Sequence, residues 1–341
     1  MGNTKKIPAA FLWRKLHSLT GLWLVIFLIE HLLTNSQAAL WIGDDGSGFV
    51  RGVNLIKSLP YLTAIEIFLL GVPILVHLIW GIIYLRSGQM NSFPSDGTTP
   101  SLTEYPRNHA YTWQRITSWI LIFTLVGHIV HMRFIDYPAD AQINDQHYYM
   151  VRVNLDEGLY TLAERLDIQL FDQNRIEKQK SSPEQVEKSL SYSAGLWSSF
   201  VDSLSGIFQT PSEGPIEKSR QEELLTEQKQ QQQHKFLQAL EKKPLRAGQI
   251  VAVVKDFGTA ELLIVRETFK MPIMIVLYTI LVLSACYHGF NGLWTFFITW
   301  GINLTEKSQR VFRRFSTLLM VLIAALGLAA IWLTYWINLK Q

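Results

Sequence analysis

The sequence is poor in cysteine and in charged residues. Cys286 is the only cysteine among 341 residues, so no disulfide can form within the chain. There is also no C-x-x-C-H run, which excludes a covalently attached c-type haem. Charged residues make up 17% of the chain, which is below the roughly 25% typical of soluble domains. The net charge of +3 gives no reason to expect a nucleic-acid partner.

Where charge is scarce, apolar residues form long runs. A helix that crosses a bilayer needs about 20 mainly apolar residues. The runs that meet this length are residues 16–33, 61–85, 116–135, 271–300 and 315–337. The first run lacks a small-residue cleavage site and more spans follow it, so we expect no signal peptide. We predict an all-α membrane protein with five transmembrane helices, in which Cys286 serves packing.

A polar segment separates the third span from the fourth. We therefore divide the chain into residues 1–135 with three spans, 136–269 as an extramembrane insertion, and 270–341 with two spans. About 130 residues are enough for a small domain. No catalytic motif occurs in the insertion. Its histidines, His147 and His234, have no neighbours with metal-ligand spacing, so we interpret both as solvated.

The insertion has mixed secondary-structure signals, which predict an α+β fold. Residues 148–153 alternate like a strand, and the glutamine-rich run 228–233 is typical of an exposed helix. We predict a hairpin from residues 250–254 and 261–265, because Gly258 lies between these two apolar runs. The loop at residues 86–112 is rich in proline, serine and threonine, so we expect it to be irregular.

Lysine and arginine near the span ends indicate the orientation in the membrane. The loop between the first two spans has Arg51 and Lys57 offset by Asp44 and Asp45. Three other regions are richer in basic residues: Lys5, Lys6, Arg14 and Lys15; Arg86, Arg107 and Arg115; and Lys307, Arg310, Arg313 and Arg314. We expect these three on the cytoplasmic side. The N-terminus is then cytoplasmic and the insertion faces outward.

Each of the first four spans contains a histidine that hydrocarbon would bury: His31, His77, His128 and His288. An ionisable side chain within the membrane is costly without a partner, which makes it a functional hypothesis. Glycines follow two of them at i+4, on the same helix face: Gly81 and Gly292. An imidazole above such a gap suits a flat cofactor.

The depths of the four histidines predict two sites. At about 1.5 Å per residue from the cytoplasmic end, His31 lies roughly 25 Å up its span and His77 roughly 14 Å. His128 and His288 lie near roughly 20 and 18 Å, and counting alone leaves their order open. The natural solution pairs His31 with His128 above, and His77 with His288 below.

Two imidazoles that face each other suit a b-type haem, because neutral imidazole is a common axial ligand. Zinc or copper would need three or four clustered ligands, which these depths do not supply. Coordination by two histidines leaves no open iron position, so the cofactor would carry electrons. Two haems stacked along the membrane normal would form an electron path across the bilayer.

Four stretches carry a family resemblance. They are RKLHSLTGLWLVIFLIEHLLTN at 14–35, SLPYLTAIEIFLLGVPILVH at 58–77, WQRITSWILIFTLVGHIVHMR at 113–133 and HGFNGLWTFFITWGINLTEKSQR at 288–310. In these the chain resembles the dihaem cytochrome b membrane anchor of bacterial succinate dehydrogenase (succinate:quinone oxidoreductase). The resemblance is to the type in which one five-span subunit carries both haems, as in Bacillus.

The resemblance implies two b haems, a distal one held by His31 and His128 and a proximal one held by His77 and His288. It also implies that His128, and not His131, is the ligand. The implied partners are a flavoprotein that oxidises succinate, an iron–sulfur subunit on the cytoplasmic face, and menaquinone near the outer face. The implied location is the bacterial inner (cytoplasmic) membrane. The chain itself would not bind succinate.

Two departures from the family pattern stand out. The insertion at 136–269 is longer than the connection usual there, and span four lacks the carboxylate found in some fumarate-reducing relatives. That absence favours succinate oxidation.

Other polar residues near the span ends have two readings. His17, Ser18 and Arg115 lie where haem propionates need donors, or they anchor the helices at the interface. Glu66 and Glu30 could relay protons to a quinone, or hydrogen-bond a neighbouring helix or reach outward. The basic cytoplasmic rim could contact the iron–sulfur subunit, or reflect only the positive-inside rule.

Three alternatives stay open. One is a dihaem cytochrome b anchor of a hydrogenase or formate dehydrogenase. Another is a haem-free transporter whose histidines relay protons, although the internal repeat expected of many transporters is not visible. The third is an envelope-interaction protein with a vestigial redox core.

Overall fold

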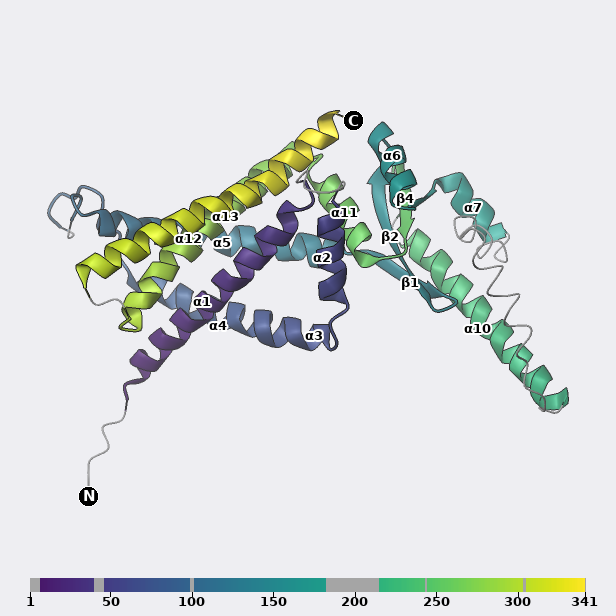
Figure 1. The fold of residues 1–341 in the computed structure, drawn as a ribbon, viewed down its shortest axis with the longest axis horizontal. Helices are drawn as coiled ribbons and strands as arrows, with labels where there is room; N and C mark the ends of the chain where they lie inside the picture. Colours follow the sequence, from purple (N-terminus) through teal and green to yellow (C-terminus); the bar gives the residue numbers. More distant parts are fainter. Residues whose placement is uncertain are drawn as a thin grey trace, which may run out of the picture. The chain divides into compact units, whose positions relative to one another are not determined.

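The computed structural model describes residues 7–39, 46–98, 101–181, 215–242, 244–302 and 305–340. Lys5, Lys6, Asp44 and Asp45, which entered the orientation argument, lie outside these residues. The chain forms two compact units. The first unit contains Met1–Ile135 and Thr268–Lys340, and the second contains Asp136–Glu267. Figure 1 labels their elements.

The first unit is a set of long helices. Among the described residues, five helices are long and apolar enough to cross a membrane. Each predicted run lies within one of them, apart from at most one residue at either end, and several of the helices extend further than predicted. The first span is α1 (Ala9–Ser36). The second is one continuous helix made of α3 (Leu62–Ile65), η1 (Glu66–Gly71) and α4 (Val72–Ser87), and the third is α5 (Pro106–Val130) continued by η2 (His131–Ile135). The fourth and fifth are α12 (Pro272–Thr299) and α13 (Glu306–Lys340). The prediction of a mainly helical chain with five candidate membrane spans is thereby confirmed.

Helix α12 packs against α1, α5 and α13, and α1 also packs against α4. Small residues permit these close approaches. A Cβ at Gly327 would lie 2.8 Å from Val282 Cγ1 and 3.2 Å from a methyl of Leu32. A Cβ at Gly289 would lie 3.3 Å from Val25 Cγ2. Helices in lipid associate through such van der Waals contact, so these glycines set the spacing of α1, α12 and α13.

Pro73 explains the irregular second span. It has no N–H, so the carbonyl of Leu69, four residues earlier, loses its helical donor. The Nε1 of Trp23 on α1 donates to that carbonyl instead. The chain takes up the π-helical conformation of η1 over Glu66–Gly71, directly before the proline. The distortion of the second span therefore has a local cause, Pro73, and the freed carbonyl has a partner on another helix.

Two connections differ from the expectation. The helix α5 begins at Pro106, within the loop that we expected to be irregular as far as residue 112. Proline suits the first helical turn, where its missing N–H would have no helical partner. A further helix, α2 (Ser47–Lys57), lies between the first two spans and follows Gly46 at φ 85°.

The second unit is built on a four-stranded antiparallel sheet with the order β1-β2-β4-β3. The strands are β1 (Ala139–Ile143), β2 (Gln146–Asn154), β3 (Gln169–Phe171) and β4 (Gln249–Val254). Asn144 and Asp145 join β1 to β2 with φ angles of 46° and 64°, as a two-residue type I′ hairpin requires. The strand predicted at 148–153 lies within β2.

In the described part of this unit, four helices accompany the sheet: α6 (Glu157–Arg165), α7 (Gln173–Ser181), α10 (Pro215–Glu241) and α11 (Phe257–Thr268). One face of the sheet forms a core with α7 and α10, in which Phe236, Phe171 and Val251 are almost completely buried. The alternate residues of β4, such as Ala252 and Val254, are buried as well. Because strand side chains alternate, β4 is covered on both faces. The run 228–233 lies in α10 and is mostly exposed, as predicted.

The predicted hairpin is wrong in its second half. Residues 261–265 belong to the helix α11 and not to a strand. Asp256 begins this helix: its carboxylate accepts from the backbone N–H and the hydroxyl of Thr259, both at 2.8 Å. Aspartate is a strong N-cap, and a short apolar run does not by itself distinguish a strand from a buried helix. The Asp256–Gly258 signal is therefore a helix start.

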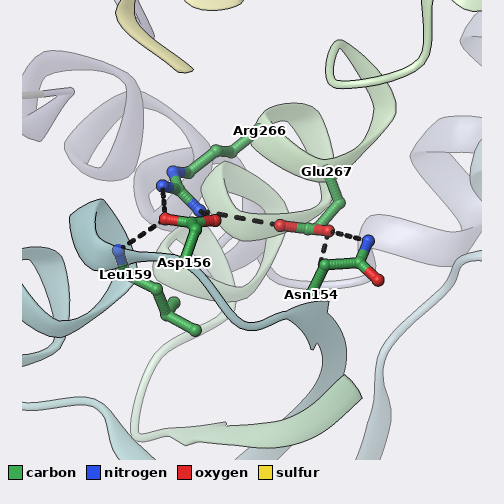
Figure 2. Close-up of polar contacts among 5 residues, drawn as sticks. All are labelled: Asn154, Asp156, Leu159, Arg266 and Glu267. Carbon is green, nitrogen blue, oxygen red and sulfur yellow. Dashed lines mark hydrogen bonds and ion pairs between the residues drawn. The ribbon is translucent and has the colours of Figure 1, made fainter. Parts of the chain in front are cut away.

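An ion pair between a buried arginine and a partly exposed aspartate joins α11 to the start of α6 (Figure 2). Arg266 is 7% exposed, and its two terminal nitrogens donate to the Asp156 carboxylate at 2.6 and 3.0 Å. The same carboxylate caps α6 by accepting from the backbone N–H of Leu159 at 2.9 Å. Glu267 accepts from the backbone and side-chain nitrogens of Asn154. These bonds connect α11, α6 and β2.

Candidate functional site

The four histidines predicted as a constellation lie in two pairs within the first unit. The ring centres of His31 on α1 and His128 on α5 are 5.9 Å apart. Those of His77 on α4 and His288 on α12 are 6.0 Å apart. These are the pairs that the depth count suggested.

The spacing within each pair suits a shared metal. Two metal–nitrogen bonds of about 2 Å, with about 1 Å from each nitrogen to its ring centre, separate two rings by roughly 6 Å. A bare ion would need more ligands than a pair supplies. Among the described residues, no three histidine, cysteine, aspartate or glutamate side chains form a metal-binding group. The pairs therefore suit a metal whose remaining ligands come with it.

Three of the four imidazoles have a hydrogen-bond partner at Nδ1. His77 Nδ1 lies 3.1 Å from the carbonyl oxygen of His17, and His288 Nδ1 lies 3.1 Å from the Ser118 hydroxyl. His128 Nδ1 lies 3.2 Å from the Tyr278 hydroxyl. Histidines that bind metals usually donate their other ring nitrogen to a partner of this kind.

The hydrogen-bond partners determine the tautomers of His77 and His288, which we call the lower pair. A carbonyl can only accept, so His77 Nδ1 carries the proton that it donates to His17. The Ser118 hydroxyl donates to the Gln114 carbonyl at 2.6 Å, so it accepts from His288 Nδ1. Both Nε2 atoms therefore keep a free lone pair, which is the state that binds a metal.

The helices α5 and α12 each hold one histidine and the hydroxyl that orients the histidine on the other helix. Ser118 precedes His128 by ten residues on α5, and Tyr278 precedes His288 by ten residues on α12. Since the two helices run in opposite directions, this spacing places the two hydroxyl–histidine contacts about 15 Å apart along the helices. Neither hydroxyl was predicted, although the matched spacing was visible in the sequence.

Tyr278 also contacts His131. Its hydroxyl lies 3.1 Å from His131 Nδ1, besides its contact with His128. His131 thus lies beside His31 and His128, which we call the upper pair, and it is connected to His128 through the Tyr278 hydroxyl.

His17 and Arg115, both predicted as cofactor contacts, lie near the lower pair. The His17 ring stacks on His77 with 4.0 Å between ring centres, and its buried Nδ1 has no hydrogen-bond partner. Arg115 is 9% exposed, and one terminal nitrogen donates to the Tyr84 carbonyl at 2.9 Å. Its Nε and Nη1 are buried without partners. Ser18, the third predicted contact, is half-buried on α1.

Arg115 is therefore a buried cation that no acid neutralises among the described residues. Its guanidinium lies over the Tyr111 ring, 4.2 Å from the ring centre. It also occupies the space beside Gly88, where a Cβ would lie 1.2 Å from Nη2. Burying an unpaired charge costs roughly several kcal/mol of folding free energy. Two free donors on a buried guanidinium fit a carboxylate supplied by a ligand.

The glycine closest to His77 is not one that we predicted. A Cβ at Gly21 of α1 would lie 2.8 Å from His77 Cε1. Gly81 and Gly292, expected to leave gaps beside the imidazoles, lie nearer to other side chains. Added Cβ atoms there would be 3.7 Å from His17 Cε1 and 3.9 Å from Gln114 Nε2. The residue that makes room for His77 thus comes from another helix, which spacing within one span cannot reveal.

The two predicted quinone-site acids have protein partners. Glu66 in η1 forms an ion pair with Arg133 in η2 at 2.9 Å, with side chains 37% and 47% exposed. Glu30 accepts a hydrogen bond from the Thr34 hydroxyl at 3.0 Å, one turn along α1. Glu66 therefore links two helical segments at their π-helical turns.

Comparison with known proteins gives a partial match. No model of a known protein family matches the chain, and no solved structure matches it. The succinate dehydrogenase cytochrome b558 subunit of Bacillus subtilis (strain 168) is 30% identical over 135 residues. The match covers 39% of this chain and 60% of that protein. This distant relative supports a membrane cytochrome b anchor, as the resemblance implied.

Proposed function

We propose that the chain is the membrane-anchor cytochrome b subunit of a succinate:menaquinone oxidoreductase. The observation that carries the proposal is the pair His77 and His288, with ring centres 6.0 Å apart and both Nε2 lone pairs free. A second pair, His31 and His128, repeats the arrangement. The relative named as a succinate dehydrogenase cytochrome b558 subunit supports the choice of complex.

The histidines are the proposed axial ligands. His31 and His128 hold a distal b haem, and His77 and His288 hold a proximal one. When bound, b haem would supply one-electron chemistry at these two histidine pairs. Ser118 and the His17 carbonyl keep the proximal ligands in the metal-binding tautomer. Tyr278 orients His128.

The proximal propionates are the proposed partners of Arg115. The unpaired Nε and Nη1 of that side chain can donate to a carboxylate in the strong, charge-assisted geometry that guanidinium favours. His17 packs on the proximal ligand, and Ser18 adds a hydroxyl at the same end of α1. Burial of these groups keeps water from the lower pair.

The membrane arrangement follows from the same assignment. The iron–sulfur subunit docks on the cytoplasmic side, where the proximal site lies, and receives electrons from a flavoprotein that oxidises succinate. Menaquinone is reduced near the distal site and the outer face, where Glu66 and Glu30 are the candidates for proton delivery. The N-terminus is cytoplasmic, and the segment 136–269 forms an outer domain of the bacterial inner membrane protein.

Purification from native membranes tests the function. We expect the chain to copurify with a succinate-oxidising flavoprotein and an iron–sulfur protein, and to show a b-type spectrum with two reduction potentials. A hydrogenase or formate dehydrogenase partner would replace the proposal with the other dihaem anchor. A folded protein without a Soret band would favour the proton-relaying transporter.

Alanine at Gly21 should lower the haem content at the proximal site. The new Cβ would meet His77 Cε1 at 2.8 Å, so the ring must move from its place opposite His288. The pyridine haemochrome spectrum of purified protein measures the loss, which we expect to approach half of the total haem. Gly81→Ala is the matched control, because its Cβ makes ordinary contact with His17 at 3.7 Å. Equal losses in both variants would contradict the role of Gly21.

A further inference from the structure

A cavity of the first unit lies between α5, α12 and α13. Its volume is about 210 Å³, whereas a water molecule in the liquid occupies about 30 Å³. The residues that matter here are Arg107 on α5, Tyr287, Phe290 and Trp294 on α12, and Arg313 and Met320 on α13.

The cavity changes in character with depth. It lies at the end of the unit where α5 and α13 begin and α12 finishes. Arg107 belongs to the first turn of α5, and Arg313 is the eighth residue of α13. Tyr287 and Met320 lie seven residues further in than Trp294 and Arg313, which is about 10 Å along a helix. Two cations therefore border the opening, and aromatic and aliphatic side chains line the depth.

Much of the polar surface of the wall is already satisfied within the protein. The Asn291 amide donates to Gln114 Oε1 at 2.7 Å and accepts from Trp294 Nε1 at 2.8 Å. The Ser316 hydroxyl donates to the Phe290 carbonyl. The Thr317 hydroxyl donates to the Arg313 carbonyl at 2.9 Å. These groups are held by the helices, so charge at this site comes from the two arginines.

Neither arginine is neutralised by an acidic side chain among the described residues. Arg107 donates to Gln309 Oε1 at 2.8 Å, which leaves its charge uncompensated. Both residues are exposed. Two cations at the opening attract an anionic group. The apolar interior below them disfavours a small ion and favours a ligand with a long apolar part.

We propose that this cavity binds one anionic phospholipid. The phosphate pairs with Arg107 and Arg313, and an acyl chain lies against Phe290, Tyr287 and Met320. Basic pockets between transmembrane helices recognise anionic headgroups in this way. The proposal gives Arg313 a role that the other basic residues near the start of α13 do not share. For the whole rim, the sequence suggests only a contact with a partner subunit or the positive-inside rule.

Lipid retention by the full-length protein tests the proposal. The protein is reconstituted with phosphatidylglycerol and phosphatidylcholine in competition, and bound lipid is counted by native mass spectrometry. We expect wild type to retain one phosphatidylglycerol preferentially. Arg107→Gln combined with Arg313→Gln should lower that preference about thirtyfold, since each of the two basic residues contributes about 1 kcal/mol. Arg310→Gln with Arg314→Gln removes equal charge beside the cavity and should leave the preference nearly unchanged, because neither residue lines the cavity.

A cavity-filling variant gives a second test that does not depend on removing charge. Thr317→Trp keeps both arginines but occupies the space for the acyl chain, so it should also lose the bound lipid. Circular dichroism and melting temperature establish that each variant is folded. Equal loss in the two arginine pairs would mean general surface attraction and overturn the proposal. So would retention of lipid by Thr317→Trp, or recovery of a quinone from this cavity by organic extraction.

Discussion

Alanine in place of His77 or of His288 should reduce the haem content of the purified protein by half. Each replacement removes one of the two ligands that we assign to the proximal site, and a b haem has no covalent attachment to retain it. The remaining half should keep a single reduction potential. Pyridine haemochrome content and a redox titration followed by the optical spectrum measure both quantities.

The pairing makes this prediction sharper than a loss of haem alone. The double variant His77→Ala with His288→Ala should lose no more than either single variant, because the two residues serve one site. His77→Ala with His31→Ala should lose all haem, because it damages both sites. These outcomes follow from ring-centre distances of 5.9 and 6.0 Å within the pairs.

A nearby histidine provides the matched control. His131 lies one turn beyond His128 on the same continuous helix and contacts the same Tyr278 hydroxyl. His131→Ala should therefore retain both haems, with at most a shift in the distal potential. Loss of the distal haem from His131→Ala, with retention in His128→Ala, would exchange their roles. Loss of the distal haem in His77→Ala would refute the pairing itself.

Methionine in place of Arg266 should destabilise the second unit by about 2 kcal/mol. The change leaves the Asp156 carboxylate without the two guanidinium hydrogen bonds of Figure 2. The Asp156 side chain is 29% exposed, so water compensates part of the charge that remains, and the cost is below that of breaking a fully buried pair. Asp156 also caps α6, so the start of that helix should become less stable. Pulse proteolysis of the full-length protein, with cleavage sites assigned within 136–267, measures the change.

An exposed pair in the same unit is the control. Lys255 and Asp167 lie 2.6 Å apart, but their side chains are 36% and 49% exposed. Such pairs contribute roughly 0–1 kcal/mol, so Lys255→Met should leave the proteolysis profile nearly unchanged. Equal destabilisation by both variants would show that the burial of Arg266 does not set its contribution.

The membrane helices could be predicted from the sequence because the bilayer imposes a simple rule. Backbone groups in hydrocarbon must be hydrogen-bonded within the segment, so an apolar run of about 20 residues becomes a helix. The runs at 16–33 and 315–337 needed no tertiary information. The family resemblance is supported in part, by a match at 30% identity to a cytochrome b558 subunit over 39% of the chain.

The extramembrane unit was harder to predict because its segments are short. Residues 148–153 alternate clearly and form β2, whereas 261–265 are apolar on several sides and form α11. The run fits a strand or a helix equally well. Its helical state is set by the Asp256 cap and by packing in the unit, where Leu263 is completely buried.

The sequence by itself determined that this protein has five apolar helices with histidines at defined depths, because both properties depend only on the order of residues along one chain. The tertiary structure decided which groups complete the site. Ser118 with His288, Tyr278 with His128 and Gly21 with His77 are contacts between different helices. They depend on how far each helix is rotated and shifted against its neighbour. Packing of side chains sets that rotation and shift, and no pattern within one helix contains it.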